Sequence, residues 1–346
     1  MKQRIRRQFS LVTHSPDVAE LRYGVWNSVS FNLRDDAKSG HLAKLLMRLD
    51  GTSSLQEIAK EEGIAIDEVN RVVSNLEELG VLESEARNVV DYALEHIPGS
   101  GGDPVDLAAA ATPLDIIGDT ELASALARLV AATLPKASIT IHGPTSPLSA
   151  ALGNAALSSK EDGLRFHEAN EPFTDLRGRF VIFISNIIDP IRLKRLNRAC
   201  FQQGTPWLHA ALDGPFVFVG PVTIPGRSAC FECFETRVTL NLRESASYQE
   251  YKKAIVKHAI RYGEIPARPL LEALLLAHSA VEAVSFMVTG HTCTVNKALS
   301  IYVPTMEFAY HDILRVPNCE ACSLQRGAAS RETYFDVAAV SQPTDT

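Results

Sequence analysis

Two Cys-x-x-Cys pairs, far apart along the chain, constrain this sequence more than any other feature. Cys230 and Cys233 form the first pair, and Cys319 and Cys322 form the second. A Cys-x-x-Cys turn can direct two thiolates at one ion, and two such turns complete a tetrahedral shell of four sulfurs. We therefore expect a structural zinc ion that joins the segment near Phe231 to the segment near Pro317.

A closed four-sulfur shell leaves no open position for water, so such a metal stabilises the fold and does not catalyse. Two other interpretations remain open: a thioredoxin-like redox pair, or four unrelated cysteines. The motif occurs twice, and neither copy lies beside a βαβ pattern, which favours zinc. Cys200 and Cys293 are interpreted as buried or incidental thiols, with a nucleophilic role as the alternative.

Bulk composition restricts the classes of protein. With 346 residues and 46% apolar content, the chain is long enough for two or three folded domains. A formal charge of −7 gives no broad attraction for nucleic acid or an anionic membrane. The basic start, residues 1–7, resembles a signal n-region, but no apolar run of signal length follows it. We therefore expect a cytoplasmic protein without a nucleic-acid or membrane partner.

The first 90 residues predict a winged-helix-like module. Alternating apolar and polar residues between positions 9 and 33 predict a small antiparallel sheet. Three helical patterns follow: a leucine stripe over 42–49, a short helix opened by the capping box of Ser54 and Glu57, and a helix that ends at Gly80.

A second domain is predicted beyond a linker. Residues 91–115 are rich in glycine, proline and alanine and are predicted to be the linker. Over 116–330, short apolar runs alternate with helical patterns, which predicts an α/β domain with a mostly parallel sheet, and 331–346 form a tail. Its first strand is predicted at 137–142, and later strands at 164–167, 180–184, 216–224 and 299–303.

These motifs resemble two known families. The blocks 206–214 and 222–226, together with the cysteine pairs, resemble the ThiF/MoeB, or ubiquitin-activating-like, superfamily over residues 115 to 325. The module at 9–85, with Phe31-Asn-Leu33, Leu49-Asp-Gly51 and Leu55-x-x-Ile58, is similar to PqqD-like precursor-peptide recognition elements. Together they resemble the cyclodehydratase partner proteins that work with YcaO enzymes in azoline-forming ribosomal peptide (RiPP) pathways, including bacteriocin biosynthesis.

The resemblance implies a function and two alternatives. The first module would bind the leader region of a precursor peptide, and the second domain would deliver it to, and activate, a separate YcaO cyclodehydratase. The chain itself would carry no catalytic residue, and it would form a homodimer. The first alternative is an ATP-dependent enzyme that adenylates a peptide carboxylate, and the second is a winged-helix DNA-binding regulator.

The resemblance also implies a degenerate nucleotide site, so ATP is not expected as a cofactor. Active relatives hold ATP with a glycine-rich loop after the first strand, expected here at Gly143, where two following prolines remove N–H donors. Their magnesium-binding aspartate would fall at Ile188, with Asn186 and Asp189 out of register beside it. Glu168 remains as a possible ribose contact.

The charge of the third helix argues against DNA binding. Asp67, Glu68, Glu77 and Glu78 oppose only Arg71, and such a helix would repel phosphates. Capture of a peptide by strand addition instead needs an exposed sheet edge and a neighbouring groove, which the segment 25–33 and the helix 67–79 supply. The candidate peptide-binding residues are Val25, Trp26, Asn27, Ser28, Val29, Ser30, Phe31, Val69, Val72 and Val73.

Each of those apolar side chains has an alternative role in the core. Strand periodicity predicts one face of the segment as inward, with Val25, Val29, Phe31 and Leu33, and the other face, with Trp26 and Ser30, as outward. A second feature, the basic run Arg192, Lys194, Arg195 and Arg198, is interpreted as a solvated helix face, with a partner-docking patch as the alternative.

Overall fold

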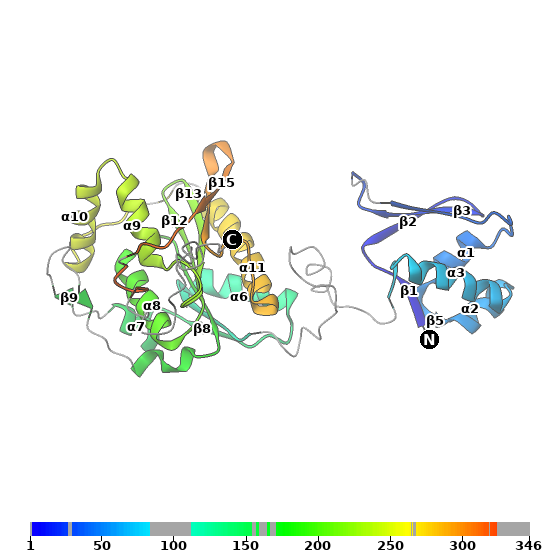
Figure 1. Cartoon of the computed structure of the whole chain (residues 1–346), viewed down its shortest axis with the longest axis horizontal. Helices are drawn as coiled ribbons and strands as arrows, with labels where there is room; N and C mark the ends of the chain where they lie inside the picture. The colour runs from blue at the N-terminus through cyan, green and yellow to red at the C-terminus, as the bar shows by residue number, and fades with distance from the viewer. Residues whose placement is uncertain are drawn as a thin grey trace, which may run out of the picture. The chain divides into compact units, whose positions relative to one another are not determined.

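A computed structural model describes residues 2–26, 30–83, 112–153, 157–158, 165–166, 171–263, 265, 268–317 and 319–323. The chain divides into two compact units, Met1–Asp103 and Pro104–Thr346 (Figure 1). The division falls within 84–111, outside the described residues, so the predicted start of the linker stays a prediction. The predicted tail 331–346 also lies outside the described residues, so its boundary stays a prediction.

The first unit contains the predicted antiparallel sheet. Strands β2 (Phe9–Ser15), β3 (Val18–Tyr23) and β4 (Ser30–Arg34) lie in the order β2-β3-β4. Phe31 and Leu33 pack against the core while Ser30 and Asn32 are exposed, which confirms the predicted alternation for these residues. Strand β4 is therefore one edge of this three-stranded sheet.

Three helices complete its core. They are α1 (Leu42–Arg48), α2 (Leu55–Glu62) and α3 (Ile66–Glu78). The capping box is confirmed, since the Ser54 hydroxyl accepts from the Glu57 N–H while the Glu57 carboxylate accepts from the Ser54 N–H. Gly80 ends α3 with a φ of 68°, a conformation that favours glycine.

The first unit contains a second small sheet that was not predicted from the sequence. Strand β1 (Lys2–Ile5) lies between β5 (Asp50–Ser54) and β6 (Leu82–Glu83), antiparallel to both. Arg4 and Arg7 lie within 3.7 and 3.8 Å of the buried Glu83 carboxylate. The basic start of the chain is therefore a paired strand of the folded unit.

The second unit is a mixed α/β domain around a seven-stranded sheet of order β15-β14-β13-β12-β11-β7-β8. The parallel half consists of β7 (Leu114–Gly118), β8 (Ile139–His142), β11 (Phe180–Ser185) and β12 (Trp207–Asp213). The other half is antiparallel and consists of β13 (Phe216–Thr223), β14 (Lys297–Tyr302) and β15 (Glu307–Asp312).

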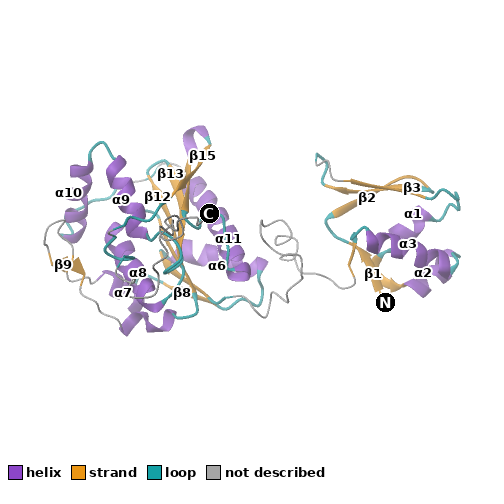
Figure 2. Ribbon diagram, in the orientation of Figure 1, coloured by secondary structure: helices purple, strands orange, loops and turns teal. Residues whose placement is uncertain are grey.

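Helices cover both faces of this sheet (Figure 2). One face carries α6 (Thr120–Thr133) and α11 (Arg268–Thr289), and the other carries α8 (Pro190–Gln203) and α9 (Phe231–Asn241), with α7 (Pro147–Gly153) and α10 (Ser245–Val256) beside α8. The inner strand β11 is buried throughout its apolar run because Phe180 stacks on Phe286 while Phe183 joins the cluster under α8.

Two strand predictions need correction. Leu114 and Asp115, assigned to the linker, begin β7, which pairs with both β8 and β11, so 137–142 is not the first strand of the sheet. The predicted strand 164–167 is described only at β10 (Arg165–Phe166), which pairs with β9 (Leu157–Ser158) in a separate two-stranded sheet. Leu114–Gly118 is five residues long and contains the charged Asp115, so the segment is too short and too mixed for periodicity to classify.

Helix α11 is, among the described residues, the one helix long and apolar enough to cross a membrane by length and composition. Half of its apolar window is buried inside the fold, where Leu271, Leu275 and Ala283 lie against α6 and the sheet. Such burial is typical of a core helix in a folded domain.

Candidate functional site

The structure brings the four predicted metal ligands together. Cys230 and Cys233 lie at the start of α9, and Cys319 and Cys322 lie in the turn that follows β15. The Sγ atoms of Cys230 and Cys319 are 3.5 Å apart, as are those of Cys233 and Cys322, and all four Sγ atoms lie within 4.8 Å of one another. A tetrahedral shell with Zn–S bonds of about 2.3 Å has sulfurs about 3.8 Å apart. The four thiols therefore fit a metal ion such as zinc.

The surroundings of the cluster suit thiolates. All four cysteines are buried beside Phe201, Ala298 and Ile313. The Val316 N–H donates to Cys233 Sγ at 3.3 Å, as backbone donors do around metal-bound sulfur. Hydrogen bonds to the neighbouring thiols, together with burial, raise the pKa of Cys230, because four thiolates repel one another unless a cation lies between them.

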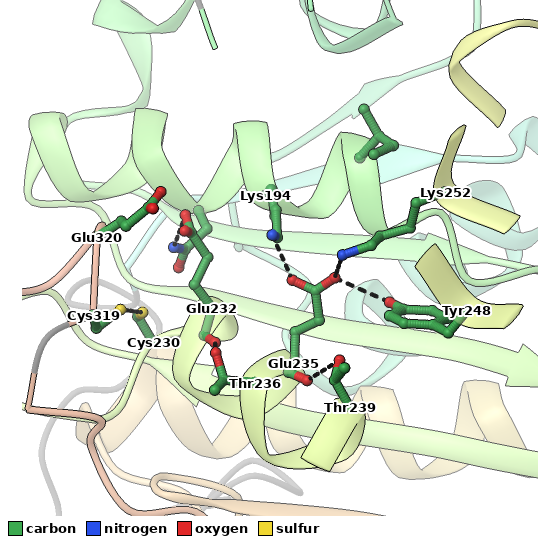
Figure 3. A network of polar contacts seen from close by, with 12 residues as sticks. Lys194, Cys230, Glu232, Glu235, Thr236, Thr239, Tyr248, Lys252, Cys319 and Glu320 are labelled. Carbon is green, nitrogen blue, oxygen red and sulfur yellow. Dashed lines mark hydrogen bonds and ion pairs between the residues drawn. The ribbon is translucent and has the colours of Figure 1, made fainter. Parts of the chain in front are cut away.

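An arginine from α8 joins the two cysteine turns. Arg198 Nε and Nη2 donate to the two carboxylate oxygens of Glu232, at 2.9 and 3.1 Å, and Nη2 also donates to Glu320 at 3.0 Å. Glu232 lies between the two cysteines of the first pair, and Glu320 between those of the second. Figure 3 shows Glu232 and Glu320 together with Cys230 and Cys319. The guanidinium thus compensates acidic charge from both turns.

The basic run on α8 is therefore largely paired or buried, and its interpretation as a solvated face was wrong. Lys194 Nζ lies 2.9 Å from Glu235, which also accepts from Lys252 Nζ at 3.2 Å and from the Tyr248 hydroxyl at 3.1 Å (Figure 3). Burial alone would lower the pKa of Lys194, but the neighbouring Glu235 carboxylate outweighs this effect and the pKa is raised. Arg195 is only 8% exposed. This network holds α8, α9 and α10 together.

A groove lies between the edge strand β4 and helix α3 in the first unit. Its volume is about 260 Å³, with an apolar floor and a charged rim. The floor includes Leu33, Leu42, Leu45, Val72 and Leu76, and the rim includes Arg34, Asp35, Asp36, Glu68 and Arg71. Val72 was among the predicted peptide-binding residues, whereas the leucines were not, because helical and strand periodicity assigns them equally well to the core.

The other candidate peptide-binding residues divide into three groups. Val69 and Val73 are buried core residues, and Phe31 is partly buried against the same core. Val25 and Trp26 are 77% and 99% exposed, so the inward prediction for Val25 was wrong; the chain leaves β3 at Gly24, whose φ of 74° turns it away from the sheet. Asn27, Ser28 and Val29 lie outside the described residues.

Three of the four predicted nucleotide residues lie in the described part of the chain. Gly143 follows β8, the second strand of the sheet along the chain, so the expected position of the glycine-rich loop was wrong. Asp189 caps α8 by accepting from the Ile191 and Arg192 N–H groups, whereas Asn186 donates to Asp119. Glu168 lies outside the described residues.

A cavity of about 640 Å³ opens beside the carboxyl ends of β8 and β11. Its lining includes Pro144, Asp189, Arg192, His258 and Tyr262. Ligands of open α/β sheets bind at this edge of the sheet. The cavity is therefore one position in the described part of the second unit where a small molecule or a peptide segment could be held.

Comparisons with known proteins locate this fold. No family model matches the chain, and no curated protein does. Among solved structures, the heterocyclase TruD is similar with a TM-score of 0.61 at 17% identity, over 93% of this chain and 42% of that one. A heterocyclase in complex with substrate and cofactor has a TM-score of 0.59 at 16% identity, over 92% of this chain and 39% of that one. E. coli MccB has a TM-score of 0.51 at 15% identity, over 97% of this chain and 100% of that one.

These likenesses show the fold. The chain spans about two fifths of the length of the heterocyclase TruD and the whole length of MccB. The fold that this chain shares with them includes the mixed α/β unit around the seven-stranded sheet.

Proposed function

We propose that this chain binds the leader region of a ribosomally made precursor peptide and delivers it to a separate YcaO cyclodehydratase, which it activates. The first unit acts as a winged-helix-like, PqqD-like recognition module. The second unit is a zinc-stabilised, dimeric docking domain, and azoline formation takes place on the partner. The single observation that carries the proposal is the groove between β4 and α3.

The groove supports peptide binding because it combines two recognition elements. Strand β4 ends its sheet, so its outer edge can pair with an added strand through main-chain hydrogen bonds. The apolar floor formed by Leu33, Leu45 and Val72 can take a side chain of that strand, while the charged rim fixes its register. A heterocyclase with substrate and E. coli MccB with MccA are among the similar structures, and both contain a bound partner.

A separate partner is part of the proposal because the sequence motifs resemble cyclodehydratase partner proteins that work with a YcaO enzyme. The region that this chain matches is 42% of the heterocyclase TruD. Holding the substrate on one subunit raises its effective concentration at the other without adding a catalytic group.

The test is leader binding to the full-length protein, measured by fluorescence anisotropy with a labelled precursor leader. Val72→Asp places a charge on the groove floor and is expected to weaken binding by at least about tenfold. Met47→Asp, at an exposed position of α1 outside the groove, is the matched control and should bind normally. Equal affinity in wild type and Val72→Asp, with both folded, would place the peptide elsewhere.

A second candidate function is adenylation of a peptide carboxylate with ATP. The cavity of about 640 Å³ at the carboxyl ends of β8 and β11 favours it, because it is large enough for a nucleotide and carries Arg192. Mg-ATP titration and pyrophosphate exchange with candidate peptides distinguish the two functions. Exchange activity would make adenylation the function of the second unit.

A further inference from the structure

The order of the parallel strands defines a switch point in the second unit. From β7 the chain passes to β8 on one side and later to β11 on the other. Open α/β sheets bind ligands in the crevice outside the carboxyl ends of two such strands. Phosphates in that crevice are held by the loop after the first strand and by the N-terminus of the next helix.

In this chain that loop is Gly118-Asp119-Thr120. At Gly118, the last residue of β7, the backbone lies close to β11. Gly118 has a φ of 150°, and a Cβ atom there would lie 1.8 Å from the carbonyl oxygen of Ile184. Only glycine fits such an approach. The two strand ends therefore close together at the point where a ligand would otherwise enter.

The side chain of Asp119 lies across this closed end. Asp119 is the N-cap of α6, but its carboxylate makes no hydrogen bond to the first turn of that helix. Its Oδ2 atom instead accepts from the Asn186 N–H at 3.2 Å and from Asn186 Nδ2 at 3.1 Å. The carboxylate thus joins the ends of β7 and β11 where a bound phosphate would bridge them.

The charge around Asp119 also opposes an anionic ligand. Glu121 adds a second carboxylate in the first turn of α6. Arg268 is near the carboxylates of Asp119 and Glu121, but its Nε donates to Glu272 at 2.6 Å. Arg128 lies two turns further along α6. The N-terminus of a helix favours anions, and at α6 the carboxylates of Asp119 and Glu121 already provide that negative charge.

We propose that Asp119 is an internal occupant of the switch-point crevice, which holds β11 through Asn186 and excludes phosphate groups from the second unit. The chain's own carboxylate takes the position of a ligand phosphate, so the domain keeps the sheet of a nucleotide-binding fold without its polyphosphate site. This assignment concerns the second unit alone, and it stands or falls independently of leader binding.

The test is calorimetric titration of the full-length, zinc-loaded protein with inorganic tripolyphosphate and with Mg-ATP. Asp119→Asn keeps an acceptor for Asn186 and removes the charge, and Asp119→Gly removes the side chain. We expect no binding by wild type up to millimolar ligand, and an affinity at least about tenfold higher in both variants. Asp175→Asn, an exposed carboxylate of the same unit, is the charge-matched control and should behave as wild type.

Asn186→Ala provides an independent check, because it removes the side-chain hydrogen bond to Asp119 but leaves the backbone N–H bond and the carboxylate in place. It should not gain tripolyphosphate binding. Equal affinities of wild type and Asp119→Asn would overturn the proposal, and so would folded Asp119 variants that bind no tripolyphosphate, because another feature would then close the crevice. Micromolar binding by wild type overturns it whatever the variants do.

Discussion

Replacing Arg198 with alanine should weaken both the fold and the binding of the proposed zinc ion. The Arg198 side chain is 27% exposed and its partner Glu232 is 8% exposed, whereas Glu320 is 80% exposed. Removing one partner of a buried ion pair costs about 3 to 5 kcal/mol, and an exposed pair contributes about 1 kcal/mol or less. Because Arg198 retains some contact with solvent, we expect the free energy of unfolding to fall by an amount at the low end of that range, about 3 kcal/mol.

The loss arises almost entirely at Glu232. In Arg198→Ala this buried carboxylate would remain beside four sulfurs without its bidentate partner. Glu232→Gln in the Arg198→Ala background should therefore recover part of the lost stability, and the double-mutant cycle isolates the coupling between the two. Glu320→Gln, which breaks only the exposed contact, should change the free energy of unfolding by less than about 1 kcal/mol.

Two assays measure this. Urea unfolding of the zinc-loaded protein gives the change in free energy, and transfer of zinc to a chromogenic chelator gives its release rate. Arg198→Ala should unfold at lower urea and release zinc faster, while Glu320→Gln should match wild type in both. Wild-type stability and release in Arg198→Ala would refute the argument, since the arginine would then not couple the two cysteine turns.

Three further predictions follow from single contacts. Cys322→Ser should release the metal and lower the melting temperature, as metal analysis and calorimetry would show; a variant that retains both would exclude a zinc site joining the turns. Burial lowers the pKa of His209 from 6.5 to about 4. The unfolded chain therefore takes up the proton first, and stability should fall by up to about 3 kcal/mol between pH 6.5 and 4. His209→Gln should flatten that part of the pH profile measured by urea unfolding, and an identical profile would contradict it. Gly118→Ala would set its Cβ against the Ile184 carbonyl and should cost at least about 3 kcal/mol in the same assay, and a neutral effect would show that β7 and β11 can separate.

Features that depend on neighbouring residues were determined by the sequence itself. The capping box of Ser54, the end of α3 at Gly80 and the alternation of Phe31 and Leu33 all follow from local geometry. The two Cys-x-x-Cys pairs predicted a common site because their chemistry requires four ligands. In each case the physical cause lies within a few residues or in a fixed coordination number.

Pairing between distant residues was decided only by the tertiary structure. The sheet around β1 joins three short segments whose partners local patterns do not specify, and β7 is an inner strand because β8 and β11 pair with it. Whether a charged or apolar side chain is exposed depends in the same way on what packs against it. Arg198 therefore pairs across the cysteine turns and Asp119 across the sheet ends, and neither position is encoded by its own neighbours in sequence.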